Sequence, residues 1–463
     1  MKFFIFTLFL NFTLFNFTNL YSQHSNPDVE KHRETAISIK NLALNDPHGY
    51  HLLEKLVEFG PRLSGSENLI NAENFLLELL QNYGFDTVYY QNVEAPHWVR
   101  GNTEKLNIIS PYIEKKHLAI RALGNSIGTN GGEINAPVIM FDNFDQLEEA
   151  KESVKGKIVF FNNKYDQTLL NTFEGYSKAV RYRVDGAWRA AKYGAKAVLI
   201  RSVTTSFDNV PHTGTLRYVD TIPKIPGAAL GVQDAEFLAS LIQNSGEVVL
   251  SLNLSCEMKG LTTVKNIIAE IRGSVKPEEI VLVGGHIDSW DLGDGSHDDG
   301  GGCMQSIDVL RIFKVLDLKP SRTIRCVLFA NEENGLRGAL DYGKNSKEMG
   351  EKHIAAIESD AGVFTPRGFK AKTDSLTLSK LQSFLPLLQL TGIEWVKPGG
   401  GGADINQIPD VRAYIGYSPD EQRYFDLHHS DNDTFDKVNL REMQLGTAAM
   451  AILTFLISEE GLD

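Results

Sequence analysis

Hydrophobic periodicity divides the chain into three parts, of which the first is helical and ends in a strand. Apolar residues at helical spacing predict helices over residues 26–44, 48–60 and 67–85, and Gly84 is expected to end the third. The run 86–95 then has the β-branched and aromatic residues of a strand. This succession is typical of a layered α/β fold.

The middle part, residues 118–256, has a different pattern. Short apolar runs at 136–142, 155–163, 195–202 and 246–255 are separated by turns rich in Gly, Asn and Thr, and one helix is predicted at 187–193. The pattern indicates a compact, β-rich domain inserted into a larger fold.

The last part alternates strands and helices again. Buried strands are predicted at 278–285, 323–330, 352–359 and 411–418, and helices at 300–318 and 440–457. Polar clusters follow the strands: His286 with Asp288, then Asp298 with Asp299, Glu332 with Glu333, Asp360, and His428 with His429. Because open α/β sheets bind ligands at the carboxyl ends of their strands, we expect these clusters to converge.

The gathered acidic groups need compensation. Neighbouring carboxylates raise one another's pKa and resist burial, yet the stretch GGHIDSWDLGDGSHDDGGG holds two histidines and five aspartates. Imidazole and carboxylate ligands without thiolate suit zinc or a similar divalent ion. Two such ions about 3.5–4 Å apart form a common hydrolytic site, so hydrolysis at a metal pair is the chemistry that this set favours.

Other motifs are incomplete or missing. The segment from Asp294 has some likeness to a calcium-binding loop, but Asp299 stands where glycine is needed and Gln305 where glutamate is needed. The sequence has no GxSxG elbow between a predicted strand and a predicted helix, no GxxxxGK[ST] and no GxGxxG after a strand. Serine-hydrolase, nucleotide and dinucleotide sites therefore lack their signatures.

Net charge and the N-terminal segment indicate which partners the protein has and where it is located. With 46 Lys and Arg against 59 Asp and Glu, the net charge is −13 and no long basic run occurs, so nucleic acid is not an expected partner. Residues 1–22 are typical of a secretory signal peptide, and polar residues such as Asn11 and Asn16 disfavour the alternative, a stable membrane anchor. We expect a secreted protein, extracellular or periplasmic, whose three cysteines are too few for a disulfide framework.

Five motifs together resemble a known family. GGHIDSWDLG, DDGGG, NEENG, ESDAG and HHSDNDT, in this order, resemble the signatures of the di-zinc exopeptidases that include secreted bacterial aminopeptidases. GPRLSGS, GADIN and the doubled histidine are most similar to a carboxypeptidase branch of that family. The resemblance implies a mixed, largely parallel central sheet flanked by helices, built from residues 23–117 and 257–463, with a protease-associated domain inserted at 118–256.

The resemblance also implies the cofactor and the roles of the site residues. Two zinc ions per chain would be bound by His286, Asp298, Glu333, Asp360 and His429, with Asp298 bridging them. Two catalytic residues are implied: Glu332 as the general base, and Asp288 as the carboxylate that holds the other ring nitrogen of His286.

Neighbouring residues receive lesser expectations. Asp299 is expected to cap the following helix, His428 to contact the substrate or a ligand, and His297 to be solvated. The family shapes its substrate pocket with the loops that correspond to 399–406 and 424–427.

The expected function is that of a secreted, zinc-dependent exopeptidase that hydrolyses dipeptides or short peptides, as a dipeptidase or carboxypeptidase. The alternative is a di-zinc aminopeptidase, because the same metals can serve either end of a peptide. A non-catalytic receptor-like relative or a one-zinc cyclase fits less well, because every matching ligand position is occupied and a cyclase leaves the insert unexplained. The resemblance also suggests a homodimer.

Overall fold

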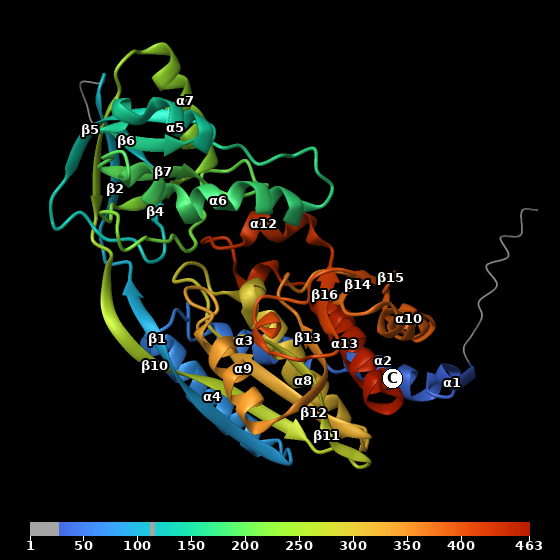
Figure 1. The fold of residues 1–463 in the computed structure, drawn as a ribbon. Helices are drawn as coiled ribbons and strands as arrows, with labels where there is room; N and C mark the ends of the chain where they lie inside the picture. Colours follow the sequence, from blue (N-terminus) through green and yellow to red (C-terminus); the bar gives the residue numbers. More distant parts are fainter. Residues whose placement is uncertain (1–26, 112–115) are drawn as a thin grey trace, which may run out of the picture.

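The protein is built on two mixed β-sheets flanked by helices (Figure 1). The computed structural model describes residues 27–111 and 116–463. The expected signal peptide, residues 1–22, lies outside the described residues. In Figure 1 the two sheets form separate units, one above the other, and the larger unit contains both ends of the described chain.

The first sheet carries the strands that precede the polar clusters. Its spatial order is β1 (Thr87–Val99), β10 (Glu257–Ile271), β12 (Arg322–Phe329), β11 (Lys276–His286), β13 (Lys352–Glu358), β16 (Tyr414–Pro419), β14 (Pro366–Lys372) and β15 (Trp395–Pro398). The central strands β12, β11, β13 and β16 run parallel, whereas β1 and β10 pair antiparallel with their neighbours. At the other edge, β14 is antiparallel to β16 and parallel to β15. The prediction of a mixed, largely parallel sheet is confirmed.

Helices bury both faces of this sheet. Along β11, Val281 and Val283 face one core while Leu282 faces the other. Because β11 is buried on both sides, its sequence is a continuous run of apolar residues. The first core is covered by α2 (Arg33–Asn45), α3 (His48–Val57), α4 (Glu67–Asn82), α8 (Gly301–Val315), α10 (Ser375–Ser383), α11 (Leu385–Leu388) and α13 (Leu440–Glu460), and the second by α9 (Arg337–Met349). The short helices α1 (Pro27–Glu30) and α12 (Tyr424–Leu427) complete this unit.

The C-terminal helix α13 is a core element. Within the described residues it alone has the length and apolar composition of a membrane span, but 78% of its most apolar window is buried inside the protein. Its start is fixed by the Asn439 side chain, which accepts hydrogen bonds from the backbone N–H groups of Arg441 and Glu442. Burial of this kind is typical of a central helix in a water-soluble fold.

The second sheet forms the inserted unit. Its spatial order is β3 (Lys116–Leu118), β2 (Glu104–Ser110), β9 (Val249–Leu254), β5 (Ile134–Phe141), β6 (Ile158–Phe161), β7 (Ala197–Arg201), β8 (Gly227–Leu230) and β4 (Ile120–Ala122). The insert therefore begins at β2, earlier than the expected boundary at residue 118.

The insert contains more helix than the sequence pattern predicted. In the described part of the insert, three α-helices pack on its sheet: α5 (Phe144–Ala150), α6 (Thr172–Ala191) and α7 (Val232–Asn244). The prediction of one helix at 187–193 was wrong because the buried face of α6 consists largely of small residues, such as Ala179, Gly186 and Ala190, which give little apolar signal.

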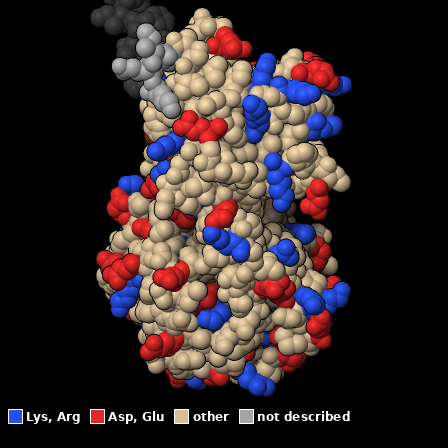
Figure 2. Space-filling view, turned by 90° about the vertical axis from the view of Figure 1, so that its left-hand side faces the viewer, with Lys and Arg blue, Asp and Glu red and all other residues tan. Residues whose placement is uncertain are grey.

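Two adjacent strands connect the units. β1 and β10 form a long antiparallel ribbon in which Val99 pairs with Glu257, and the chain leaves for the insert and returns from it at this end. Figure 2 shows the side of the molecule that carries the ribbon, where cationic and anionic side chains are interspersed. Cys256, Cys303 and Cys326 are all buried free thiols, so packing rather than disulfides stabilises the described part of the fold.

Candidate metal centre

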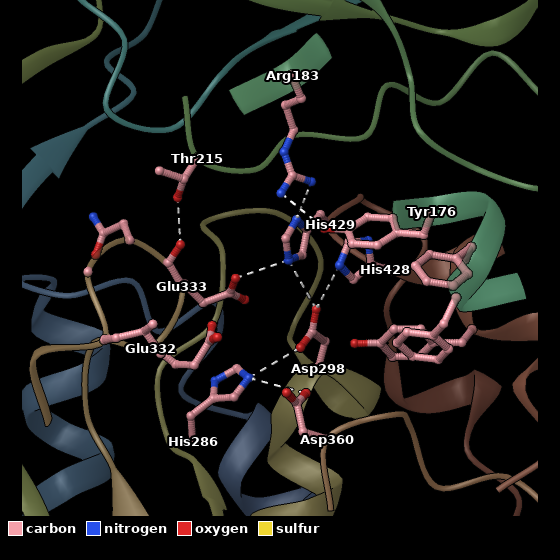
Figure 3. Close-up of a pocket in the computed structure, with 16 residues that line it drawn as sticks. Tyr176, Arg183, Thr215, His286, Asp298, Glu332, Glu333, Asp360, His428 and His429 are labelled. Carbon is pink, nitrogen blue, oxygen red and sulfur yellow. Dashed lines mark hydrogen bonds and ion pairs between the residues drawn. The ribbon is translucent and has the colours of Figure 1, made fainter. Parts of the chain in front are cut away.

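The strand ends of the first sheet bring the predicted side chains together. His286 is the last residue of β11, Glu332 and Glu333 follow β12, and Asp360 follows β13. The loop after α12 adds His429 (Figure 3). Because the strands are parallel neighbours, their carboxyl ends meet at one edge of the sheet, as expected.

Asp298 lies at the centre of this cluster. Its Oδ1 is 3.3 Å from Nε2 of His286, which is itself 3.6 Å from Oδ1 of Asp360. Its Oδ2 is 3.3 Å from Nε2 of His429, which is 3.0 Å from Oε2 of Glu333. The two oxygens of one carboxylate thus face two separate sets of ligands, one with Asp360 and one with Glu333.

The electrostatics of these residues fit bound cations. Asp298 Oδ2 and Glu333 Oε1 are buried and have no hydrogen-bond partner among the described residues, a costly arrangement for a carboxylate. Burial and the carboxylate of Asp298 raise the pKa of Glu333 well above its usual value. Burial also lowers the pKa of His429 well below its usual value, which favours the neutral imidazole that ligates metals. Nitrogen and oxygen donors without thiolate suit zinc.

His428 is a neighbour of the cluster. Its ring stacks on that of His429 with centroids 3.5 Å apart, and its Nε2 is 3.9 Å from Oδ2 of Asp298. The ligand atoms of these three residues lie within 4.8 Å of one another. His428 is thus placed to contact either a ligand or the substrate, as expected.

Glu332 is a partly exposed carboxylate on the wall of a cavity of about 460 Å³. Desolvation in this cavity, together with the carboxylates of Asp360 and Asp288, raises the pKa of Glu332 to about 8. A carboxylate with a raised pKa holds a proton more readily than an exposed one. Its position suits exchange of a proton with a molecule in the cavity.

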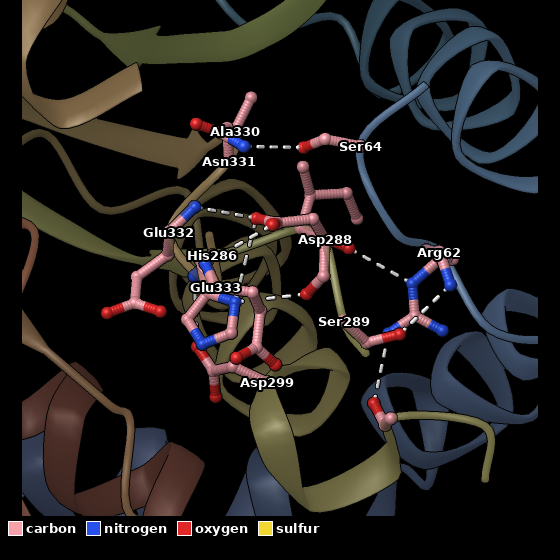
Figure 4. Close-up of polar contacts among 12 residues, drawn as sticks. Arg62, Ser64, His286, Asp288, Ser289, Asp299, Ala330, Asn331, Glu332 and Glu333 are labelled. Atoms are coloured by element: carbon pink, nitrogen blue, oxygen red, sulfur yellow. Dashed lines mark hydrogen bonds and ion pairs between the residues drawn. The ribbon is translucent and has the colours of Figure 1, made fainter. Parts of the chain in front are cut away.

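Asp288 supports the site differently from the expectation. The partner of His286 Nδ1 is the backbone carbonyl of Asp288, at 3.0 Å, and the nearer carboxylate oxygen lies 3.8 Å away. The carboxylate instead accepts hydrogen bonds from the backbone N–H groups of Glu332, at 3.0 Å, and Glu333, at 3.4 Å (Figure 4). It therefore fixes the loop that carries both glutamates.

Arg62 fastens the loop between β11 and α8. Its buried guanidinium donates to the backbone carbonyls of Ile287, Asp294 and Gly295, at 3.0, 2.7 and 3.0 Å. The Arg62 backbone N–H also donates to Oγ of Ser289, at 2.9 Å (Figure 4). The GPRLSGS segment thus holds the chain that leads from His286 to Asp298.

Asp299 and His297 both lie in the interior of the site. Asp299 accepts from the backbone N–H of Gly302 in the first turn of α8, the expected cap, and also from the N–H of His286. The expectation that His297 is solvated was wrong: it is 1% exposed and stacks on Phe364, with ring centroids 4.3 Å apart. Burial lowers the pKa of His297 to about 4, because Phe364, from a distant part of the chain, covers it.

The two pocket loops have different positions. Tyr424 and Phe425 line the cavity. No residue of 399–406 lines it; in this loop the N–H groups of Asp404 and Ile405 donate to the carboxylate of Glu358. The loop 399–406 therefore supports the end of β13 and does not form part of the cavity wall.

The insert supplies residues that sequence reasoning missed. Oγ1 of Thr215 donates to the backbone carbonyl of Glu333, at 2.6 Å, and the N–H of Thr213 donates to that of His429, at 2.8 Å. Tyr176 and Arg183 of α6 line the cavity. No sequence motif marks these positions, because their role depends on how the insert folds over the first sheet.

Comparison with known proteins places the chain among peptidases. The model of Peptidase family M28 matches residues 266–453. Carboxypeptidase Q of Mus musculus is 37% identical over 437 residues, which cover 93% of this chain and 91% of that protein.

Solved structures give the same result. A peptidase M28 precursor from Shewanella amazonensis has a TM-score of 0.88 at 35% identity, covering 93% of this chain and 97% of that one. A zinc aminopeptidase from Bacillus subtilis has a TM-score of 0.63 at 21% identity, covering 87% and 94%, and shares the fold.

Proposed function

Because this chain belongs to peptidase family M28, we propose that it is a secreted, zinc-dependent exopeptidase that hydrolyses dipeptides or short peptides as a dipeptidase or carboxypeptidase. The observation that carries the proposal is the position of Asp298, whose two oxygens face two separate ligand sets. His286 and Asp360 would hold one zinc ion, and His429 and Glu333 the other. When bound, such a pair of ions supplies Lewis acidity for amide hydrolysis.

Glu332 is the proposed general base. Its carboxylate is on the cavity wall, where it can accept a proton from the attacking water and return it to the leaving amine. Asp288 positions this carboxylate through the backbone N–H of Glu332. A displacement of the loop would therefore move both the general base Glu332 and the ligand Glu333.

The insert is the proposed protease-associated domain. It lies over the metal-centre edge of the first sheet (Figure 1), and α6 lines the same cavity as the metal ligands. A cavity of about 460 Å³ accommodates a short peptide and excludes a folded protein. The size of the cavity supports exopeptidase action on small substrates.

The test measures hydrolysis and metal content together. Purified protein should bind about two zinc ions per chain and release amino acids from unblocked dipeptides, and chelation should abolish this release. Glu332→Gln should keep its zinc and lose activity by about 10²–10⁴-fold, whereas Glu394→Gln, at an exposed surface glutamate, should behave as wild type. Full activity after chelation, or in Glu332→Gln, would refute the proposal.

Blocked peptides distinguish the aminopeptidase alternative. A carboxypeptidase or dipeptidase requires a free C-terminus, whereas an aminopeptidase cleaves a tripeptide whose carboxyl group is blocked. The test compares an amino-blocked with a carboxyl-blocked tripeptide. If the enzyme cleaves the carboxyl-blocked tripeptide and not the amino-blocked one, it is an aminopeptidase.

A further inference from the structure

Arg183 is the only lysine or arginine among the described residues that line the metal-centre cavity. It lies on α6 of the insert, and its guanidinium points to the ring of His429 (Figure 3). The cavity wall otherwise carries the carboxylates of Asp298, Glu332, Glu333 and Asp360. A single cation is thus placed beside the candidate catalytic groups.

Among the residues that the structure describes, the guanidinium of Arg183 has only neutral hydrogen-bond partners. Its Nη2 donates to Oη of Tyr176, at 3.0 Å, and its Nη1 to the backbone carbonyl of Thr213, at 3.4 Å. Its Nε has no hydrogen-bond partner, and no carboxylate of the described residues forms an ion pair with it, although the side chain is only 6% exposed. A buried cation without a counter-ion is costly, so an anionic ligand would be strongly favoured here.

When His429 ligates a metal, it cannot accept a hydrogen bond from Arg183. Nη1 of Arg183 is 3.4 Å from Nδ1 of His429. A neutral imidazole that ligates through Nε2 carries its hydrogen on Nδ1, and such a nitrogen cannot accept a hydrogen bond from a guanidinium. In the metal-bound protein this donor of Arg183 is therefore available to a ligand.

The backbone around Arg183 is shaped to admit its head group. Gly214 has φ of +130°, and a Cβ added there would lie 2.3 Å from Cζ of Arg183. A side chain at position 214 would therefore displace the guanidinium. Aromatic rings of Phe173, Tyr176 and Phe425 border the same cavity and offer an apolar surface next to the cation.

We propose that Arg183 binds the free α-carboxylate of the peptide substrate and so makes the enzyme specific for the C-terminal residue. The inference rests on the proposed function and adds the residue that decides which end of the peptide is recognised. A guanidinium and a carboxylate form paired, charge-assisted hydrogen bonds. The adjacent aromatic rings fit a C-terminal residue with an apolar side chain.

The experiment compares one dipeptide in two forms. Alanyl-leucine carries the carboxylate, and alanyl-leucinamide replaces it with a neutral amide. For the wild type we expect kcat/KM to be about 100-fold higher for the acid, the size typical of close charge pairs at interfaces. Arg183→Gln should bring this ratio below about 5, and Arg183→Lys should give an intermediate ratio because lysine supplies charge without the paired donors.

Arg181→Gln is the matched control. Arg181 lies on the same helix and is exposed, so its removal should leave the acid-to-amide ratio unchanged. Equal zinc content and circular dichroism in all variants would confirm that the site and the fold are intact. A wild-type ratio near 1, or an Arg183→Gln variant that loses both activities equally, would overturn the inference.

A binding measurement separates this inference from the proposed function. Calorimetry with the zinc-loaded Glu332→Gln protein measures the affinity for alanyl-leucine without turnover. Adding Arg183→Gln to that protein should weaken binding of the acid about 100-fold and of the amide little. If the wild type cleaves neither compound, the proposed function fails, while unequal loss of binding still supports the carboxylate site and equal loss refutes it.

Discussion

Substitution of Arg62 by methionine tests how the metal-binding loop is held. The change keeps an unbranched side chain but removes the donors to Ile287, Asp294 and Gly295. The carbonyl of Gly295 keeps the N–H of Gly300 as a donor, whereas those of Ile287 and Asp294 lose their guanidinium donor. The carbonyl of the buried Ile287 and that of the half-buried Asp294, at about 1–3 kcal/mol each, plus about 1 kcal/mol for the shared one, give about 3–7 kcal/mol.

Part of this loss is offset. Burial lowers the pKa of Arg62, which means that the charged guanidinium is itself disfavoured at this position, and methionine avoids that cost. We therefore expect Arg62→Met to reduce the free energy of unfolding by about 2–5 kcal/mol. Because the loop leads to Asp298, zinc affinity should also fall by about 10–100-fold.

Urea denaturation and zinc competition with a chelator measure the two effects. Arg217→Met is the control: Arg217 is 61% exposed and pairs with Asp185 at the surface, so its loss should cost less than about 1 kcal/mol. Were Arg62→Met as stable as the control variant, the carbonyl contacts would not hold the loop and the reasoning would be wrong.

Three further predictions concern neighbouring positions. Asp288→Asn leaves one oxygen for the two N–H groups of Glu332 and Glu333, so kcat should fall about 10–100-fold with the fold intact; steady-state kinetics and circular dichroism check this, and an unchanged kcat would contradict it. Thr215→Val removes the hydrogen bond to the carbonyl of Glu333 and should cost about 1 kcal/mol of stability; zinc should then dissociate faster in a chelator assay, and an unaltered rate would count against this contact. Burial raises the pKa of Glu73 from 4.5 to about 7, so the folded chain binds this proton more tightly than the unfolded chain. The resulting stability is complete below pH 4.5 and is lost as the pH rises through 7. Glu73→Gln should therefore be more stable than wild type at pH 8, by an amount on the order of 2–3 kcal/mol, and should show a flatter pH dependence in urea titrations; a wild-type pH profile would refute this assignment.

The convergence of the site residues could be predicted because it follows from strand topology. His286, Glu333 and Asp360 each follow a run that is apolar at successive positions, and such runs form parallel strands whose carboxyl ends meet. The resemblance of the ordered motifs to a peptidase family is confirmed by the comparisons. The local sequence was enough to predict the position of a site residue where that position depends only on one strand and the loop that follows it.

Contacts between distant segments could not be predicted. His297 is buried because Phe364 stacks on it, and nothing near position 297 indicates that neighbour. The carboxylate of Asp288 accepts hydrogen bonds from the N–H groups that follow β12 rather than from the imidazole of His286. This pairing depends on the distance between the ends of β11 and β12. Arg183 and Thr215 reach the site from the insert, so their role depends on the placement of one unit on the other.

The order of strands along the chain has a consequence for how the molecule is made. Among the described residues, β1 is the only strand of the first sheet that precedes the insert, and all strands of the second sheet precede β10. During synthesis the ribosome therefore completes the unit that contains Arg183 and Thr215 before most of the catalytic sheet exists. Domains generally fold as units in the order of their emergence, so the nascent catalytic half can assemble against a surface that has already formed.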